Sequence, residues 1–200
     1  KQILGFGEYG FPESHSASFA LLVYVSCWLK CHEPAAFTCA LLNSQPMGFY
    51  SASQLTQDAR RHGVEVRPVD VNESDWDSTL ERTTSGKPAL RLGFRQVKGL
   101  SEAAGELLVA KRGDQYVSIQ QLVERTTLNR RELSALATAG ALKSLAGHRH
   151  KVNWSVAGVE EPTPLLSSLD RYEAVPLLRR PTEGQDVVAD YRSLGLTLGR

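Results

Sequence analysis

Cysteine is scarce in this chain, and the few thiols present lie in one region. Among 200 residues there are three cysteines, at Cys27, Cys31 and Cys39. The surrounding sequence is apolar and predicted to be helical, so this odd number indicates reduced core thiols rather than a disulfide framework. No second cluster of cysteine and histidine follows that would complete four zinc ligands, and we expect no metal site.

A net charge of either sign is also lacking. The 23 lysines and arginines are nearly balanced by 22 aspartates and glutamates, which leaves a formal net charge of +1 at pH 7. The chain as a whole therefore exerts no strong electrostatic attraction on nucleic acid. Any binding of nucleic acid must come from local basic patches.

Long apolar runs are absent as well. The run from Ala17 to Leu29 is shorter than the about 20 residues needed to cross a bilayer, and there is no signal-peptide layout. With 42% hydrophobic and 22% charged residues, the composition is that of an ordinary globular protein with one or two domains. We expect a cytoplasmic location. Because Lys1 already lies inside a motif, we interpret the chain as a fragment of a larger protein.

No arrangement of catalytic side chains stands out. Four carboxylates occur close together in a polar connector, at Asp70, Glu73, Asp75 and Asp77. Their order does not follow the calcium-loop pattern. Ser14 and His15 are neighbours in the sequence, and adjacent residues on a helix face different directions. We therefore expect neither a catalytic residue nor a metal ligand in this chain.

A Ser-His-Ser cluster stands at the predicted start of the apolar helix. Ser14 or Ser16 can cap this helix, which ends before Pro34. Hydroxyl groups, an imidazole and free backbone N–H groups at a helix start suit an anion such as a phosphate. An ordinary capped core helix with a hydrogen-bonded histidine explains the same spacing, so the spacing alone does not decide between the two.

The sequence around this cluster resembles the fingers of the bacterial C-family DNA polymerases, the family of the DNA polymerase III alpha subunit. Residues 7–20 read GEYGFPESHSASFA, and residues 28–37 read WLKCHEPAAF. Replicative members usually read Gly-Phe-Asn-Lys-Ser-His-Ser, so Pro12 and Glu13 depart from them. This Pro-Glu pair, with LLNSQPMGFY at residues 41–50, resembles the error-prone branch used in damage-induced synthesis.

A second informative stretch, residues 93–104, predicts a helix-hairpin-helix motif. Gly99 permits a tight turn and close approach to a nucleic-acid backbone, the following helix presents unpaired N–H groups, and Lys98 adds a positive charge. Such contacts hold a duplex in register without reading its sequence. The polymerase family usually reads Ile-Lys-Gly-Val-Gly here, and Ser101 replaces the second glycine. Without the family resemblance, a Lys-Gly pair before a helix is weak evidence for DNA binding.

The later sequence resembles the second half of the family's tandem helix-hairpin-helix region. Asn129 and Glu132 predict a capped helix, and a basic cluster at residues 148–151 opens the next one. This cluster fits phosphate contacts and solvated helix charge equally well. The complete set of expected DNA contacts is Arg95, Lys98, Gly99, Leu100, Ser101, Arg130, Arg131, Arg149 and Lys151.

The patterns predict a mainly α fold with a small β element, in the α+β class. Strands are expected at residues 80–82 and 89–92, on either side of a Ser-Gly-Lys turn. We expect three regions. Residues 1–63 form the C-terminal part of the fingers, residues 64–158 the small β element with the tandem helix-hairpin-helix region, and residues 159–200 a connector and helix leading to an OB-fold module outside the chain.

The resemblance implies part of an error-prone DNA-directed DNA polymerase, a nucleotidyltransferase of translesion synthesis. Ser14, His15 and Ser16 would lie near the phosphates of the incoming nucleotide. The catalytic aspartates of the family precede this region, so Mg²⁺ would be bound outside the chain, and the fragment alone is expected to be inactive. Implied partners are primer-template DNA, deoxynucleoside triphosphates and accessory proteins of the damage response. A non-catalytic helix-hairpin-helix DNA-binding or scaffolding protein remains the alternative.

Overall fold

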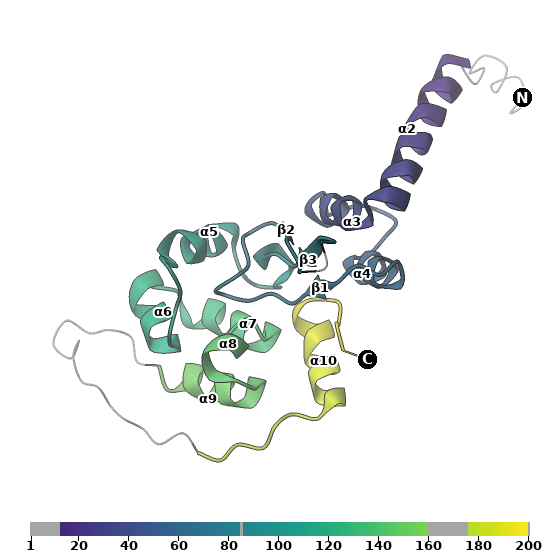
Figure 1. The fold of residues 1–200 in the computed structure, drawn as a ribbon. Helices are drawn as coiled ribbons and strands as arrows, with labels where there is room; N and C mark the ends of the chain where they lie inside the picture. Colours follow the sequence, from purple (N-terminus) through teal and green to yellow (C-terminus); the bar gives the residue numbers. More distant parts are fainter. Residues whose placement is uncertain (1–12, 85, 160–175, 200) are drawn as a thin grey trace, which may run out of the picture.

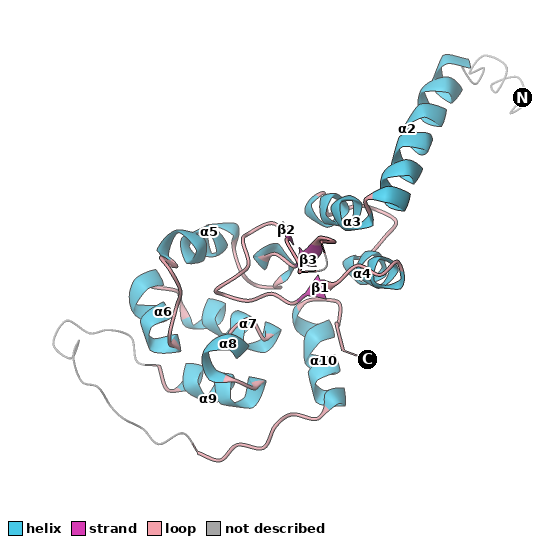
Figure 2. Cartoon of the chain, in the orientation of Figure 1, coloured by secondary structure: helices cyan, strands magenta, loops and turns pink. Residues whose placement is uncertain are grey.

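The computed structural model describes residues 13–84, 86–159 and 176–199, with the side chains of residues 13–15 left out. Within these residues the fold is mostly helical with one small sheet, which confirms the predicted class (Figures 1 and 2). The first part of the Gly-Phe-Pro motif, residues 7–12, lies outside the described residues. No helix in the described ranges is long and apolar enough to cross a membrane.

Three helices open the described chain, namely α2 (Glu13–His32), α3 (Pro34–Asn43) and α4 (Ala52–Arg61). Pro34 occupies the first turn of α3, where its missing N–H costs no hydrogen bond. Ser51 and Gln54 form the reciprocal hydrogen bonds of a capping box at the start of α4. The end of α2 before Pro34 agrees with the sequence prediction. In Figure 1, α2 projects away from the rest of the described chain.

The three cysteines fall into two environments. The Cys39 thiol is buried on α3 and donates a hydrogen bond to the Ser78 carbonyl at 3.1 Å. Burial raises its pKa. Cys27 and Cys31 are exposed on α2, so the expectation of core thiols was wrong for these two. All three cysteines are free, as predicted.

The sheet has three short strands, β1 (Val66–Arg67), β2 (Thr79–Glu81) and β3 (Ala89–Arg91). Their order is β1-β3-β2, with β1 parallel and β2 antiparallel to β3. Leu90 pairs with Val66 on one side and with Leu80 on the other. The predicted pairing of the second and third strands is confirmed.

The tandem helical region follows the sheet. It contains η1 (Phe94–Gln96), α5 (Glu102–Lys111), α6 (Ile119–Thr126), α7 (Arg130–Ala139), α8 (Lys143–Ala146) and α9 (Arg149–Ala157). Helix α10 (Glu183–Ser193) lies nearer the C-terminus. A polar side chain accepts a hydrogen bond from the first turn at several starts: Ser101 for α5, Ser118 for α6, Asn129 for α7 and Thr182 for α10. The cap at Asn129 confirms the capped helix that the sequence predicted there.

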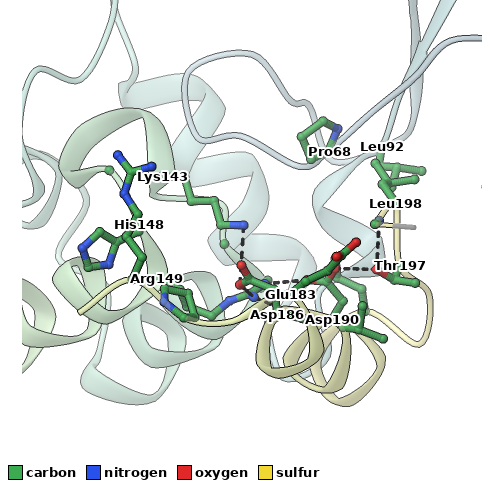
Figure 3. A pocket seen from close by; sticks show the side chains of 18 of the residues that line it. Pro68, Leu92, Lys143, His148, Arg149, Glu183, Asp186, Asp190, Thr197 and Leu198 are labelled. Carbon is green, nitrogen blue, oxygen red and sulfur yellow. Dashed lines mark hydrogen bonds and ion pairs between the residues drawn. The ribbon is translucent and has the colours of Figure 1, made fainter. Parts of the chain in front are cut away.

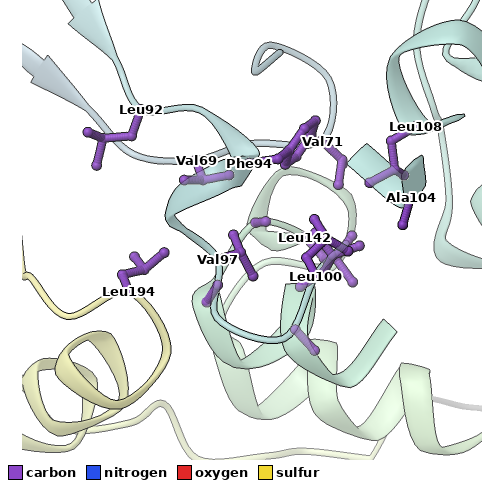
Figure 4. Packing of buried hydrophobic residues seen from close by; sticks show 14 of the residues in the cluster. Val69, Val71, Leu92, Phe94, Val97, Leu100, Ala104, Leu108, Leu142 and Leu194 are labelled. Atoms are coloured by element: carbon purple, nitrogen blue, oxygen red, sulfur yellow. The ribbon is translucent and has the colours of Figure 1, made fainter. Parts of the chain in front are cut away.

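One continuous core joins the sheet to the tandem helices. Leu92 and Phe94 from the end of the sheet, Leu108 from α5 and Leu142 before α8 are all fully buried (Figure 4). Each such side chain contributes about 1.5–3 kcal/mol by leaving water. The cluster also includes residues of α3, α4 and the stretch after α10, so it continues across the predicted division after residue 63. Hairpin and sheet are therefore held by the same packing.

Candidate nucleic-acid interface

The first hairpin is a tight turn whose apolar residues point inward. Val97 and Leu100 are buried, whereas Lys98 and Gly99 between them are exposed. Gly99 has a φ of +88°, in the left-handed region that residues with a Cβ rarely adopt. The two buried side chains anchor the turn to the core, and the Lys-Gly pair faces solvent.

Ser101 takes over a structural function at the position where the polymerase family usually has glycine. Its hydroxyl oxygen accepts a hydrogen bond from the Ala104 amide at 3.2 Å and so caps α5. The same hydroxyl donates to the Glu132 carboxylate at 3.3 Å. Ser101 thereby joins the starts of α5 and α7.

The first hairpin lies along the beginning of α7. A Cβ added to Gly99 would meet the Cβ of Ala135 at 3.9 Å. Arg131 precedes Ala135 by four residues and therefore shares its helix face. Arg130 and Arg131 are exposed, and no carboxylate of the described residues forms an ion pair with either. The structure thus places Gly99 and Ser101 beside α7, the helix that carries Arg130 and Arg131.

The end of α10 supports the hairpin from another side. The Lys98 amide donates to the Ser193 carbonyl at 2.8 Å, and the Lys98 ammonium group donates to the Tyr191 carbonyl at 3.3 Å. Cations and donors at a helix C-terminus satisfy its free carbonyl groups and favour its dipole. Arg192, between these two carbonyls in sequence, is exposed.

Two of the expected DNA contacts have internal partners instead. Arg95 Nε lies 3.0 Å from Asp77 Oδ1, and its guanidinium also donates to the Asn43 carbonyl. Arg149 is almost fully buried and pairs with Asp186 and with Asp190, the latter at 2.5 Å. These guanidinium groups join elements of the fold.

The remaining expected contacts are placed as follows. Leu100 is buried and can offer a ligand only its backbone. Lys151 is half-buried near the start of α9, away from the first hairpin, and its amide donates to His148 Nδ1 at 3.4 Å. Ser16 is exposed on α2, while Ser14 and His15 lie in its first turn and their side chains are outside the description.

A hollow of about 770 Å³ lies between α10, the start of α9 and the chain before β2 (Figure 3). Its charged lining is mixed: Lys143, Arg149 and Arg180 face Glu183, Asp186 and Asp190. Ion pairs and the hydrogen bond from Thr197 to Asp190 occupy most of these groups. The lining therefore has no excess of one charge that would select an ion.

Among the described residues, no group of three or more histidine, cysteine or acidic side chains is arranged to hold a metal ion. The acidic connector at residues 70–77 instead organises the fold: Asp70 accepts from the Asn72 amide, and Asp77 pairs with Arg95.

Comparison with known proteins gives one consistent result. The family described as the helix-hairpin-helix motif matches residues 63–152. The chain is 60% identical to an error-prone DNA polymerase of Methylococcus capsulatus, 61% identical to one of Alkalilimnicola ehrlichii and 54% identical to one of Pseudomonas fluorescens. Each similarity covers 100% of this chain but only 20–21% of the relative. The chain thus spans about a fifth of the length of these curated relatives.

Proposed function

We propose that this chain is a segment of an error-prone DNA polymerase, and that its first hairpin binds the phosphate backbone of duplex DNA; the similarity over the whole chain and the helix-hairpin-helix match support this. The observation that carries this proposal is the exposed Lys98–Gly99 turn, held in place by buried Val97 and Leu100 beside the starts of two helices. The ammonium group and the backbone N–H groups of such a turn suit phosphate oxygens.

The proposed contact set is Lys98, Gly99, Ser101, Arg130 and Arg131. Gly99 and Ser101 lie beside α7, the helix that carries both arginines. We expect these groups to meet phosphate oxygens and so to position the duplex without reading its sequence.

The activity of the whole protein is proposed to be DNA-directed DNA synthesis by an error-prone polymerase. Phosphoryl transfer in such an enzyme needs carboxylates that hold divalent metal, and we place the Mg²⁺ ligands outside this chain. Ser14, His15 and Ser16 would contribute contacts to the phosphates of the incoming nucleotide at the start of α2. The relatives named above are polymerases over lengths about five times that of this chain, so a stand-alone scaffolding protein finds no separate support.

The test measures how binding of the 200-residue chain to primer-template duplex depends on salt concentration. The variant Lys98→Glu is measured in parallel. We expect the logarithm of the wild-type binding constant to fall with the logarithm of the salt concentration, with a slope of roughly −0.9 per phosphate contact. The slope of the variant should be smaller in magnitude by about the contribution of one contact. Lys87→Glu, an exposed lysine beyond β2, is the matched control and should leave the slope unchanged. Absence of binding by the wild type at low salt would refute the proposal.

A further inference from the structure

Five basic side chains from two separate segments meet at the start of α9. They are His148, His150, Lys151, Arg179 and Arg180, and together we name them the α9 patch. The two arginines belong to residues 176–182, which the sequence patterns assign to a connector before α10 (Figure 1). The sequence separates the two halves of the patch by about thirty positions, and only the fold brings them together.

Hydrogen bonds fix the connector against α9. His150 Nδ1 donates to the Arg179 carbonyl at 2.7 Å, and the His148 ring makes a backbone hydrogen bond with Leu178. Desolvation lowers the pKa of His148, and the nearby charges of Lys151 and Arg180 lower it further. The arginines therefore extend from a fixed stretch of backbone at the surface.

The patch keeps an excess of positive charge. Arg179 and Arg180 are exposed and Lys151 is half-buried. Among the described residues, none of these three forms an ion pair. The carboxylates of Asp186 and Asp190 on the following helix are already paired with Arg149, and Lys143 adds to the positive charge near Asp186. Glu183, which lines the hollow together with Arg180, is the one carboxylate there without an ion pair in the described chain.

Helix α10 has the α9 patch near its start and the first hairpin near its end. Arg180 lies just before its capping residue Thr182, whereas Lys98 contacts the carbonyl groups at its other end. The helix has 11 residues and is therefore about 16 Å long. The phosphates on the two edges of the major groove of B-DNA are separated by a groove about 12 Å wide, which is comparable with the length of α10. A single duplex can therefore meet positive charge near both ends of this helix.

We infer that the α9 patch is a second contact for duplex phosphate, made on the same duplex that the first hairpin binds. The inference rests on the proposed function and adds Arg179 and Arg180, which lie beyond residue 152, where the helix-hairpin-helix match ends. Arginine suits this contact because its guanidinium group can donate two parallel hydrogen bonds to a phosphate.

The experiment measures salt-dependent binding of the 200-residue chain to duplex DNA for Arg179→Ser/Arg180→Ser. We expect weaker binding and a salt slope reduced by about 0.9 for each lost phosphate contact. Arg60→Ser/Arg61→Ser is the matched control, since these exposed neighbours at the end of α4 give the same change of charge. Combination with Lys98→Gln should add the two losses in free energy, as expected for separate contacts on one ligand.

The outcomes separate the inference from the proposed function. If Lys98→Gln weakens binding while the Arg179/Arg180 pair has no effect, the second contact is refuted and the first hairpin stands. An equal loss in the Arg60/Arg61 control would also refute it, because general charge would then explain the result. If the wild type fails to bind duplex DNA at low salt, both the proposed function and the second phosphate contact are refuted. Circular dichroism and thermal unfolding check that each variant is folded, and Arg179→Lys/Arg180→Lys should keep most of the salt slope.

Discussion

At the scale of single residues, Gly99 determines the shape of the first hairpin. We expect Gly99→Ala to lower the free energy of unfolding by about 1–2 kcal/mol, because its φ of +88° lies where a Cβ is unfavourable. The added methyl group would meet Ala135 only at an ordinary contact distance, so the cost comes from the backbone. Urea unfolding measures the change, and duplex binding should weaken with it.

Gly48 offers the matched control. It lies in the loop after α3, has no positive φ, and an added Cβ there would contact nothing within 4 Å. Gly48→Ala should therefore change the stability by less than about 0.5 kcal/mol. If both substitutions changed the free energy of unfolding by similarly small amounts, the turn at Gly99 would be able to change its conformation without strain, and the prediction would be wrong.

Local rules account for what the sequence predicted about these residues. The outward Lys98, the turn at Gly99 and the cap at Ser101 all depend on neighbours a few positions away, and the structure has each of them. The pairing of Arg95 with Asp77 and of Arg149 with two aspartates depends on distant residues. The sequence around a basic residue near a helix start does not show whether its side chain forms an ion pair with a distant carboxylate. These partners therefore could not be predicted.

At the scale of elements, Arg149 of α9 holds α10 in place through ion pairs with Asp186 and Asp190. Its side chain is almost fully buried, and replacing it by glutamine leaves Asp186 and Asp190 without their main partner (Figure 3). We expect Arg149→Gln to cost about 2–3 kcal/mol of stability, as for charged hydrogen bonds lost from a largely buried site. Hydrogen exchange should show faster opening of α10 than in the wild type.

Lys143 provides the comparison for this prediction. Its ammonium group lies 3.9 Å from Asp186 and is substantially exposed, so Lys143→Gln should change stability by less than about 1 kcal/mol. If Arg149→Gln proved equally mild, the buried ion pairs would not be what holds α10 in place.

Helix and strand positions were largely predictable, whereas the neighbours of α10 were not. Asn129 and Glu132 located the start of α7, and the Ser-Gly-Lys turn located the paired strands on either side of it. The contact between residues 178–180 and α9 joins segments on either side of a long connector. No local pattern encodes such a contact, and the arginines of the α9 patch were therefore missed as candidate site residues.

At the scale of the whole molecule, α2 is an exposed element: every side chain from Ser16 to His32 is exposed. Its exposed large apolar side chains are Phe19, Leu21, Leu22, Val23, Tyr24, Val25, Trp28 and Leu29. An apolar surface of this kind promotes self-association in water. Removing residues 1–32 should therefore give a more monodisperse protein by light scattering, with a thermal unfolding midpoint close to that of the 200-residue chain.

The truncation removes little that stabilises the core. The core cluster begins at Ala35 in α3, and the ion pair lost with Lys30 joins two partly exposed side chains. The variant Leu22→Ser/Val25→Ser, which keeps the helix, should also reduce association. A sharp fall in the unfolding midpoint of the truncated chain would contradict the view that α2 is energetically separate.

The contact between Lys98 and the end of α10 has a mechanical consequence. The hairpin turn and the last turn of α10 are joined through the Ser193 carbonyl, and the chain then runs through buried Leu194 and Leu196. The segment after α10 therefore begins beside Lys98, and a Cβ added to Gly195 would meet the Lys98 ammonium nitrogen at 3.5 Å. Tension or torque on this segment would reach the Lys98 turn through two hydrogen bonds.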